Sequence, residues 1–369
     1  MKVRVLQENL VKALTVASRF VSPKVQLPVL GNIFLFSKKT KLQVASTNLE
    51  TSISITVPAD SLQDGQITVP GKAITELITN LQAGTLTLEG EKEQLRISAA
   101  NFESTLTGMN ASDFPPVPSV IGKEESLILP KNLFLNAISQ VSFATSTDET
   151  RPILTGVLFI FQKNQIIFVA TDGFRLSQKK MKTKVSPKIE KLILPRGTIV
   201  EVSRIIAENE EILMAFNPNQ NQVLFGNEGM VLSSRILEGE FPDFEKIIPK
   251  ETITEILLDK EDFLRAIKLA SVFARDAGNV VKIKGGRSFV DIFAESSSSG
   301  NQTTRIDAKI EGEEKIEIAF NYRFLEEFLH AISGEAAKIG LSNSSSPGVF
   351  TDPSDPDFLH LIMPVRIQE

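Results

Sequence analysis

A helical pattern of apolar positions recurs three times along the chain. Near the N-terminus, apolar and small residues follow one another at spacings of three and four, the period of a helix that buries one face. The same spacing returns in the middle and in the last third of the sequence. The positions are Leu10, Ala13, Leu14, Ala17 and Ser18, then Phe134, Ala137, Ile138, Val141 and Ser142, then Phe263, Ala266, Ile267, Ala270 and Ser271. The shared alanines lie 124 and 129 residues apart, which predicts three copies of one helix.

A second helix recurs in step with the first, each time directly after a short run rich in apolar and β-branched residues. The copies read TVPGKAITEL, ILPRGTIVEV and IAFNYRFLEEF and begin at residues 68, 193 and 318. Pro70, Pro195 and Phe320 hold the same place at intervals of 125 residues, and a glutamate follows six residues later in every copy. Because one third of 369 residues is 123, these intervals predict three homologous domains.

Strand patterns lie between the predicted helices. They are runs of β-branched and aromatic residues bounded by turn residues, at 33–36, 51–57, 157–161, 165–170 and 287–294. Each repeat then has two helices and about eight short strands, which predicts an α+β fold with antiparallel sheets.

Two stretches rich in proline and charge end the first two repeats, at 113–125 and 240–251, and we interpret them as linkers. One hydrophobic core seldom serves more than about 300 residues, which also favours several domains. The predicted domains are residues 1–120, 121–250 and 251–369.

The net charge of −5 disfavours tight, indiscriminate binding to nucleic acid. The acidity lies in the last third, where 13 basic residues stand against 20 acidic ones, while each of the first two thirds carries +1. Positive charge can still gather on one surface of such a protein. No apolar run approaches the roughly 18 residues of a membrane helix, so we expect a cytoplasmic protein without a membrane partner.

Residues suited to catalysis or metal binding are scarce. The chain has no cysteine and only two histidines, His330 and His360, and it lacks the common phosphate-loop, dinucleotide, zinc-helix and nucleophile-elbow motifs. Asp172 precedes a glycine between two strand-like runs, which is typical of a tight hairpin turn. The pattern predicts a protein that is not an enzyme and that uses no cofactor or metal.

Basic residues share helical faces away from the apolar stripe. Arg265, Lys268 and Arg275 follow spacings of three and seven, and Arg196 and Arg204 lie eight apart. An ordinary solvated helix surface explains any single set. Several such faces turned toward one common space would instead form a surface for a polyanion, and the residues alone leave both interpretations open.

Four motifs, taken with the triplication, resemble the bacterial β sliding clamps, the processivity subunit of DNA polymerase III. They are LPVLGN at 27–32, ATDGFRL at 170–176, EFPDFEKIIP at 240–249 and MPVRI at 363–367, in the family's order and nearly its spacing. The resemblance spans the chain. It implies a DNA clamp fold in which two chains of three similar domains form a six-domain ring around duplex DNA, with helices inside and sheets outside.

The resemblance implies a homodimer that makes the replicative DNA polymerase processive. A ring retains DNA by topology, so phosphate contacts that carry no sequence information suffice. The implied partners are double-stranded DNA, the polymerase catalytic subunit, a separate clamp loader, and other polymerases and repair proteins that present short linear motifs.

The family's DNA-contacting positions carry over residue by residue. Lys24 matches a basic loop position, and the sequence departs from well-known members at Pro152 and Ile153, where paired tyrosines can touch DNA. Basic positions on the inner helices are matched by Lys12, Lys72, Arg196 and Arg204, and helical facing adds Arg265, Lys268 and Arg275.

The resemblance also implies a cleft that takes a short peptide with apolar anchors. Flexible methionine and aliphatic side chains would adapt to several ligands, while a few polar groups fix the peptide backbone. The matching positions are Leu154, Thr171, Gly173, Phe174, Arg175, Leu176, Pro242, Lys246, Ile247, Asn321, Phe324, Ser346, Leu361, Met363, Pro364, Val365 and Arg366. Phe174 stands where histidine is common, Lys246 where arginine is common, and Gln368 and Glu369 extend past the usual end. Without the resemblance, we would interpret the same residues as core strand residues.

Ring closure in the family pairs an edge strand of the first domain with one of the partner's third domain. Leu106, Val272 and Phe273 match the apolar positions of that contact. Edge pairing of this kind closes a ring without leaving a free strand edge.

Two alternatives belong to other functional classes. A carboxylate-based hydrolase would use Asp148, Glu149 and Asp172, and its turnover would disappear in Asp172→Asn. A monomeric peptide-binding scaffold would run as a single chain and would not stay on circular DNA.

Overall fold

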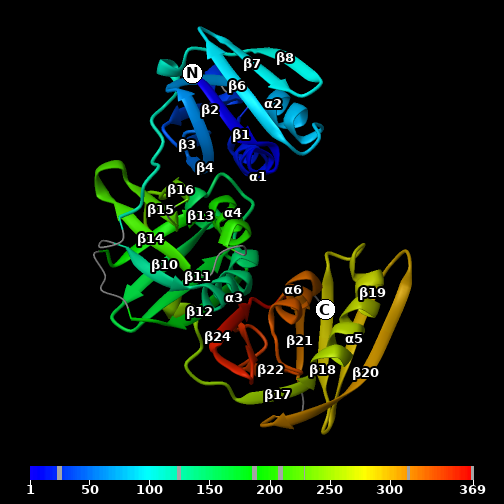
Figure 1. Cartoon of the computed structure of the whole chain (residues 1–369). Helices are drawn as coiled ribbons and strands as arrows, with labels where there is room; N and C mark the ends of the chain where they lie inside the picture. The colour runs from blue at the N-terminus through cyan, green and yellow to red at the C-terminus, as the bar shows by residue number, and fades with distance from the viewer. Residues whose placement is uncertain are drawn as a thin grey trace. The chain divides into compact units, whose positions relative to one another are not determined.

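The computed structural model of the chain describes residues 1–22, 27–122, 126–184, 189–206, 211–227, 229–313 and 316–366 (Figure 1). Within that part the chain forms six α-helices and 24 strands, and every strand pair is antiparallel. Each third of the chain contributes two helices and eight strands. The predicted α+β class and the predicted element content of a repeat are therefore confirmed.

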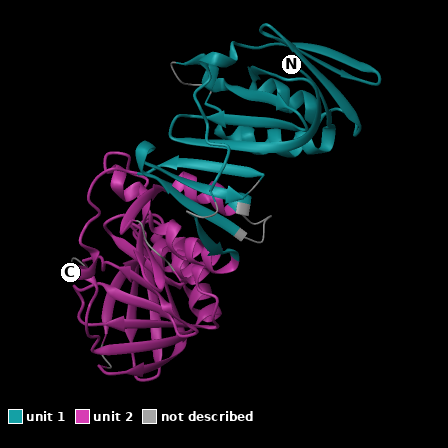
Figure 2. Cartoon of the chain, turned by 60° about the vertical axis from the view of Figure 1, so that its left-hand side comes forward, with its two compact units in different colours: residues 1–131, 204–236 teal, residues 132–203, 237–369 magenta. Residues whose placement is uncertain are grey.

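The chain divides into two compact units (Figure 2). One unit holds residues 1–131 and 204–236, and the other holds residues 132–203 and 237–369. Each unit contains one twelve-stranded sheet. The division passes through the middle repeat because four of its strands belong to one sheet and four to the other.

The sheet of the first unit joins the whole first repeat to half of the second. Its order is β8-β7-β6-β1-β4-β16-β15-β14-β9, with β3, β2 and β5 continuing from β4 as a branch. The first repeat supplies β1 (Lys2–Leu6), β2 (Asn32–Lys38), β3 (Lys41–Thr47), β4 (Thr51–Gln63), β5 (Gly65–Pro70), β6 (Thr85–Glu91), β7 (Gln94–Ala99) and β8 (Phe102–Thr107). The second supplies β9 (Leu127–Pro130), β14 (Glu211–Asn217), β15 (Gln222–Asn227) and β16 (Met230–Arg235). Helices α1 (Gln7–Ala17) and α2 (Gly71–Thr79) pack on each other and on strands of the first repeat.

The sheet of the second unit joins the rest of the second repeat to the third. Its order is β13-β10-β11-β12-β24-β23-β22-β17-β20-β19-β18-β21. The second repeat supplies β10 (Gly156–Gln162), β11 (Gln165–Thr171), β12 (Arg175–Lys182) and β13 (Lys191–Pro195). The third supplies β17 (Thr254–Asp259), β18 (Val280–Gly285), β19 (Phe289–Ser296), β20 (Gly300–Glu311), β21 (Glu317–Asn321), β22 (Ala336–Leu341), β23 (Gly348–Asp352) and β24 (Asp355–Ile362). The helices are α3 (Lys131–Val141), α4 (Arg196–Ile206), α5 (Lys260–Ala274) and α6 (Tyr322–Ala331).

The apolar stripes of the sequence become the cores. Leu10, Leu14, Phe134 and Phe263 are fully buried, as their helical spacing predicts. Ser18 is partly exposed because α1 ends at Ala17 and a 3-10 turn follows. In the part of the chain that the structure describes, no helix has the length and apolar character needed to cross a membrane.

The predicted linkers also pack. Phe114 stacks on Phe34 with ring centroids 5.3 Å apart, and Phe244, at the start of a 3-10 turn (Phe244–Ile247), is buried in an apolar cluster. These stretches therefore contribute to the cores as well as connecting the repeats. Residues 123–125 of the first stretch lie outside the described residues.

One hydrogen bond repeats in all three repeats and fixes the end of each. A residue two or three positions after the end of the eighth strand donates its N–H to a carbonyl on the fifth strand. The three bonds are Met109 N to Thr68 O at 2.9 Å, Leu237 N to Ile193 O at 2.9 Å and Val365 N to Ala319 O at 2.8 Å. The predicted triplication therefore extends to individual backbone bonds.

Candidate functional site

A tight loop connects β11 to β12, and its side chains close it from within. Asp172 Oδ1 accepts the N–H groups of Phe174 at 2.8 Å and Arg175 at 3.0 Å. Thr171 Oγ1 donates to Arg175 O at 2.6 Å and accepts the N–H of Gly173 at 3.0 Å. Gly173 has φ +93°, a left-handed conformation that glycine adopts without strain. The prediction that Asp172 belongs to a hairpin turn is confirmed.

The strand after this loop joins the second repeat to the third. β12 pairs with β24, so that Leu176 lies opposite Leu361, and Met363 N donates to Phe174 O at 2.8 Å. Leu176 and Leu361 are buried, whereas 62% of Phe174 and 39% of Met363 are exposed. The two buried leucines thus form an apolar floor beside two exposed apolar side chains. We call these four residues, together with Ile247, the junction surface.

The segment at 241–248 borders the same floor. Phe244 packs in one apolar cluster with Leu176 and Leu361, while 46% of Ile247 is exposed. Pro242 is exposed, and Lys246 donates to Asp243 at 2.7 Å. That hydrogen bond raises the pKa of Lys246 and keeps its ammonium charged.

The third repeat contributes the other side of the junction. Val365 N donates to Ala319 O at 2.8 Å, so residues 363–365 connect the Phe174 loop with β21. Asn321 caps α6 by accepting the N–H of Arg323, and Ser346 N donates to Asn343 Oδ1 at 2.7 Å. Gln368 and Glu369 lie outside the described residues.

Arg175 differs from the rest of the predicted cleft because its charged group is buried. Only 8% of it is exposed, and its guanidinium donates to Asp172, to Phe143 O and to Glu327. The sequence pattern singled out Arg175 and Asp172. The structure brings them together with Phe143 and Glu327, which the pattern did not single out. Leu154 and Thr171 are likewise buried beneath the surface.

A buried histidine lies beneath the same junction. His360 is fully buried, its Nδ1 lies 2.6 Å from Ser177 Oγ, and its ring stacks on Phe328 with centroids 5.7 Å apart. Burial, assisted by the positive charge of Arg175, lowers the pKa of His360 to about 3. The residue is therefore a neutral core group at physiological pH.

Six of the predicted DNA-contacting residues are exposed on helices, and these helices come from all three repeats. Lys72 lies 4.0 Å from Glu76, and Arg265 lies 3.3 Å from Asp262, so acidic neighbours moderate both charges. Lys24 falls outside the described residues. The exposed residues are Lys12 on α1, Lys72 on α2, Arg196 and Arg204 on α4, Arg265 and Lys268 on α5, and Arg275 directly after α5.

The predicted dimer contacts lie on two elements. Leu106 is half-buried on β8, which ends its sheet. Val272 is 58% exposed on α5, whereas Phe273 packs partly against the core of the third repeat. Leu269, which the prediction did not include, is 48% exposed one turn before Val272 and is a further candidate for this contact. Its spacing of three from Val272 was the available signal.

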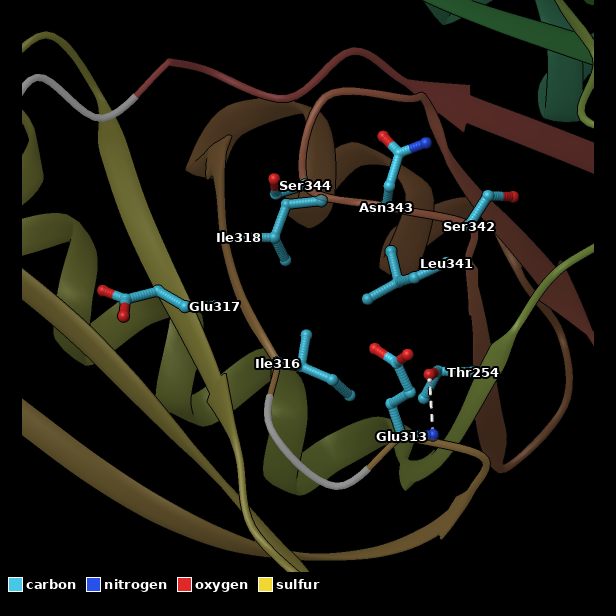
Figure 3. A pocket seen from close by; sticks show the side chains of 9 residues that line it. All are labelled: Thr254, Glu313, Ile316, Glu317, Ile318, Leu341, Ser342, Asn343 and Ser344. Carbon is cyan, nitrogen blue, oxygen red and sulfur yellow. Dashed lines mark hydrogen bonds between the residues drawn. The ribbon is translucent and has the colours of Figure 1, made fainter.

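A separate cavity of about 390 Å³ lies in the third repeat (Figure 3). Ile316 and Ile318 point into it from one side and Leu341 from the other, with the carboxylate of Glu313 beside Thr254. None of the residues of the predicted cleft lines this cavity. It therefore does not belong to the junction surface.

Comparison with known proteins follows the same division into three. Models of the N-terminal, central and C-terminal domains of the DNA polymerase III beta subunit match residues 1–118, 128–243 and 245–366. The beta sliding clamp of Staphylococcus aureus is 30% identical over 357 residues, covering 94% of both chains. The solved sliding clamp of Bacillus subtilis superposes with a TM-score of 0.94 at 27% identity over 100% of both chains. The beta subunit of Streptococcus pyogenes gives 0.93 at 26%, again over 100% of both. The chain belongs to the DNA polymerase III beta subunit family, the beta sliding clamps.

Proposed function

We propose that two copies of this chain close into a ring that encircles double-stranded DNA and tethers the replicative polymerase to it. The ring is a cytoplasmic binding platform without catalytic activity, opened and loaded by a separate clamp loader. Other polymerases and repair proteins reach it through short peptides. Domains at 1–120, 121–250 and 251–369 remain our proposal for its building blocks.

One structural rule supports ring closure. The eighth strand of a repeat pairs with the start of the fourth strand of the repeat before it: β16 with β4 at Thr51–Ile55, and β24 with β12 at Arg175–Lys179. Applied once more, the rule joins the eighth strand of the first repeat, β8, to the start of the fourth strand of the third, β20. That pairing needs a partner chain if the repeats are to close head to tail.

Both strands have the required free edge. Among the described residues, β8 pairs only with β7, and Gly300–Asp307 of β20 pairs only with β19. Free edges attract further strands unless they are covered. Leu106 lies on one edge strand, and α5, which packs against β20, carries the exposed Leu269 and Val272. An apolar contact would therefore support the strand pairing.

The basic helix residues supply weak contacts to DNA. A topological ring needs no tight grip, and strong or base-specific contacts would stop it from sliding. Exposed lysine and arginine beside acidic neighbours, such as Lys72 beside Glu76, suit transient phosphate contacts that salt weakens.

The junction surface suits a peptide with apolar anchors. Phe174, Ile247 and Met363 offer exposed apolar area over the Leu176 and Leu361 floor. At the junction of the first two repeats, a hydrogen-bonded pair, Ser52 and Ser233, occupies the position of the two leucines. The apolar floor thus supports one peptide site per chain.

Two of the three carboxylates of the rival hydrolase, Asp172 and Asp148, are already engaged in local structure. Asp172 accepts from two backbone N–H groups through one oxygen and from Arg175 through the other. Asp148 accepts from Thr150 and Arg151. Hydrogen bonds from Thr150 lower the pKa of Asp148, which disfavours a role as a general acid.

The deciding experiment compares DNA circles with linear DNA. The protein is loaded on a nicked plasmid by the clamp loader of the same organism and followed by gel filtration. We expect it to elute with the circle and to leave when a restriction enzyme linearises the plasmid. Retention on both forms would mean adhesion rather than encirclement, and retention on neither would contradict the ring.

A further inference from the structure

The guanidinium of Arg175 joins three segments of the second unit. Nε donates to Asp172 Oδ2 at 3.0 Å within its own loop, and Nη2 donates to Phe143 O at 2.8 Å in the 3-10 turn Ser142–Ala144. Nη1 donates to Glu327 Oε2 on α6. Each acceptor comes from a different segment, so one side chain fixes their mutual position.

Two aromatic rings enclose the same group. The guanidinium carbon lies 4.4 Å from the centre of the Phe324 ring and 5.5 Å from that of Phe143. Phe324 and Glu327 are three residues apart on α6, so one face of this helix presents both a ring and a carboxylate to Arg175. A planar, forked cation can satisfy such a site, whereas the ammonium of lysine cannot.

The corresponding loop at the other junction forms without an arginine. At the junction of the first two repeats, Thr47 Oγ1 donates to Thr51 O at 3.0 Å, and Asn48 Oδ1 accepts from Thr51 N at 2.7 Å. Arg235 N donates to Glu50 O at 2.9 Å, as Met363 N does to Phe174 O. The same loop and the same strand connection thus form with Thr51 in the place of Arg175.

Arg175 and its partner on α6 are therefore additions to a loop that folds without them, at the junction that carries the apolar floor. We infer that Glu327 is a positioning residue for the junction surface: through Arg175 it holds the Phe174 loop, and with it Met363, against α6. The inference rests on the proposed peptide-binding function. Glu327 would act on the junction surface through the arginine, to which it is hydrogen-bonded.

Glu327 also borders a second surface of the protein. The residue also lines an open groove between α3 and α6, with Asn136, Ser139 and His330. These helices belong to the set that the proposed ring turns toward DNA. A change on that face that draws Glu327 away would loosen the Phe174 loop.

The test uses neighbouring glutamates on the same helix. Glu327→Ala removes one of the three acceptors of Arg175, and the matched control Glu326→Ala removes a carboxylate that lies 3.8 Å from His330 instead. Alanine is a good helix former, so neither change should disturb α6. The probe is the tightest binder from a set of short fluorescein-labelled peptides that cover the polymerase catalytic subunit of the same organism.

We expect Glu327→Ala to weaken the binding of this peptide about tenfold, mainly through faster dissociation, and Glu326→Ala to leave it unchanged. Arg175→Lys should act similarly, and adding Glu327→Ala to it should cause no further loss. Equal affinities of the two alanine variants would overturn the inference. Fully additive losses would do the same, because they would mean that Arg175 and Glu327 act independently.

Amide hydrogen exchange of the free protein provides a readout that needs no peptide. In Glu327→Ala the amides of Phe174, Arg175 and Met363 should exchange faster than in Glu326→Ala. Unchanged exchange would contradict the positioning role. If the wild-type protein bound none of the peptides, the proposed peptide function would fail, and the exchange measurement would still decide whether Glu327 positions the loop.

Discussion

Buried polar residues hold the junction of the second and third repeats together in a network. Lys179 Nζ lies 2.5 Å from both carboxylate oxygens of Asp355, and Gln140 donates to the same carboxylate at 2.9 Å. His360 and Arg175 lie in the same region. Buried groups of this kind are costly when unpaired, so the network favours one register of β12 on β24.

The neutral state of His360 predicts a dependence of stability on pH. Its pKa is about 3 in the folded protein and 6.5 in the unfolded chain, so only the unfolded chain takes up the proton between these values. The stabilisation is complete above pH 6.5 and is lost as the pH falls toward 3.

Urea unfolding at pH 7.5 and pH 5.5 measures this effect. The contribution of His360 should fall by about 1.4 kcal/mol between the two values. In His360→Asn this component of the difference should vanish. An equal loss in wild type and variant would show that His360 is not the group responsible.

Met363 offers a direct test of the junction surface. Its side chain is 39% exposed and its N–H is bonded to Phe174, so Met363→Glu should keep the fold and place a charge among the apolar anchors. We expect peptide affinity, measured by fluorescence anisotropy, to fall by roughly 30-fold. Leu62→Glu, at a site that is 49% exposed on β4, is the control and should bind normally. Equal binding by both variants would remove Met363 from the site.

Single residues also mark the limit of prediction from sequence. The turn at Asp172 could be predicted because Asp-Gly between apolar runs is a local signal. The partners of Arg175 could not, since Phe143 and Glu327 lie 32 and 152 residues away and carry no pattern of their own. The burial of the guanidinium, which changes its role, follows only from these distant contacts.

At the scale of elements, the fourth strands β4 and β12 make the connections between repeats. β4 pairs with β3 and β16 along its first half and with β1 along its second. The sequence predicts a strand only over 51–57, whereas β4 extends to Gln63. The extension is polar and partly exposed, so pairing with β1 rather than an apolar pattern maintains it.

A substitution at the end of α5 gives the most direct test of the proposed dimer contact. Phe273→Arg would also disturb the core of the third repeat, so Val272→Arg is the better variant. An unpaired charge in an apolar contact should cost about 2 kcal/mol and shift the protein toward monomer in sedimentation velocity. Leu133→Arg, at an exposed site on α3, is the control. A dimer that is equally stable in both variants would exclude Val272 from the contact.

At the scale of the whole molecule, the threefold repeat was predictable because two different helix patterns recur along the sequence with the same period. The division into two sheets was not, because it depends on which free edges pair after each repeat has folded. The pairs that form are β4 with β16 and β12 with β24. In each pair the two strands lie about 180 residues apart in the sequence.

The proposed DNA contact is also a property of the whole molecule. Arg196→Glu combined with Arg204→Glu should shorten the lifetime of the protein on nicked circles several-fold at low salt, with the dimer intact. The matched control, Lys41→Glu with Lys163→Glu, makes the same charge change at exposed hairpin positions. Equal lifetimes for the two double variants would place the DNA elsewhere.

The sharing of the middle repeat between two sheets limits how this protein can be dissected. A fragment cut to residues 121–250 would expose the edges of β12 and β16 that β24 and β4 cover in the intact chain. Bare edges of this kind invite aggregation, so such a fragment should accumulate as inclusion bodies when expressed alone. The middle repeat is homologous to its neighbours, yet it should be the least stable of the three as an isolated fragment.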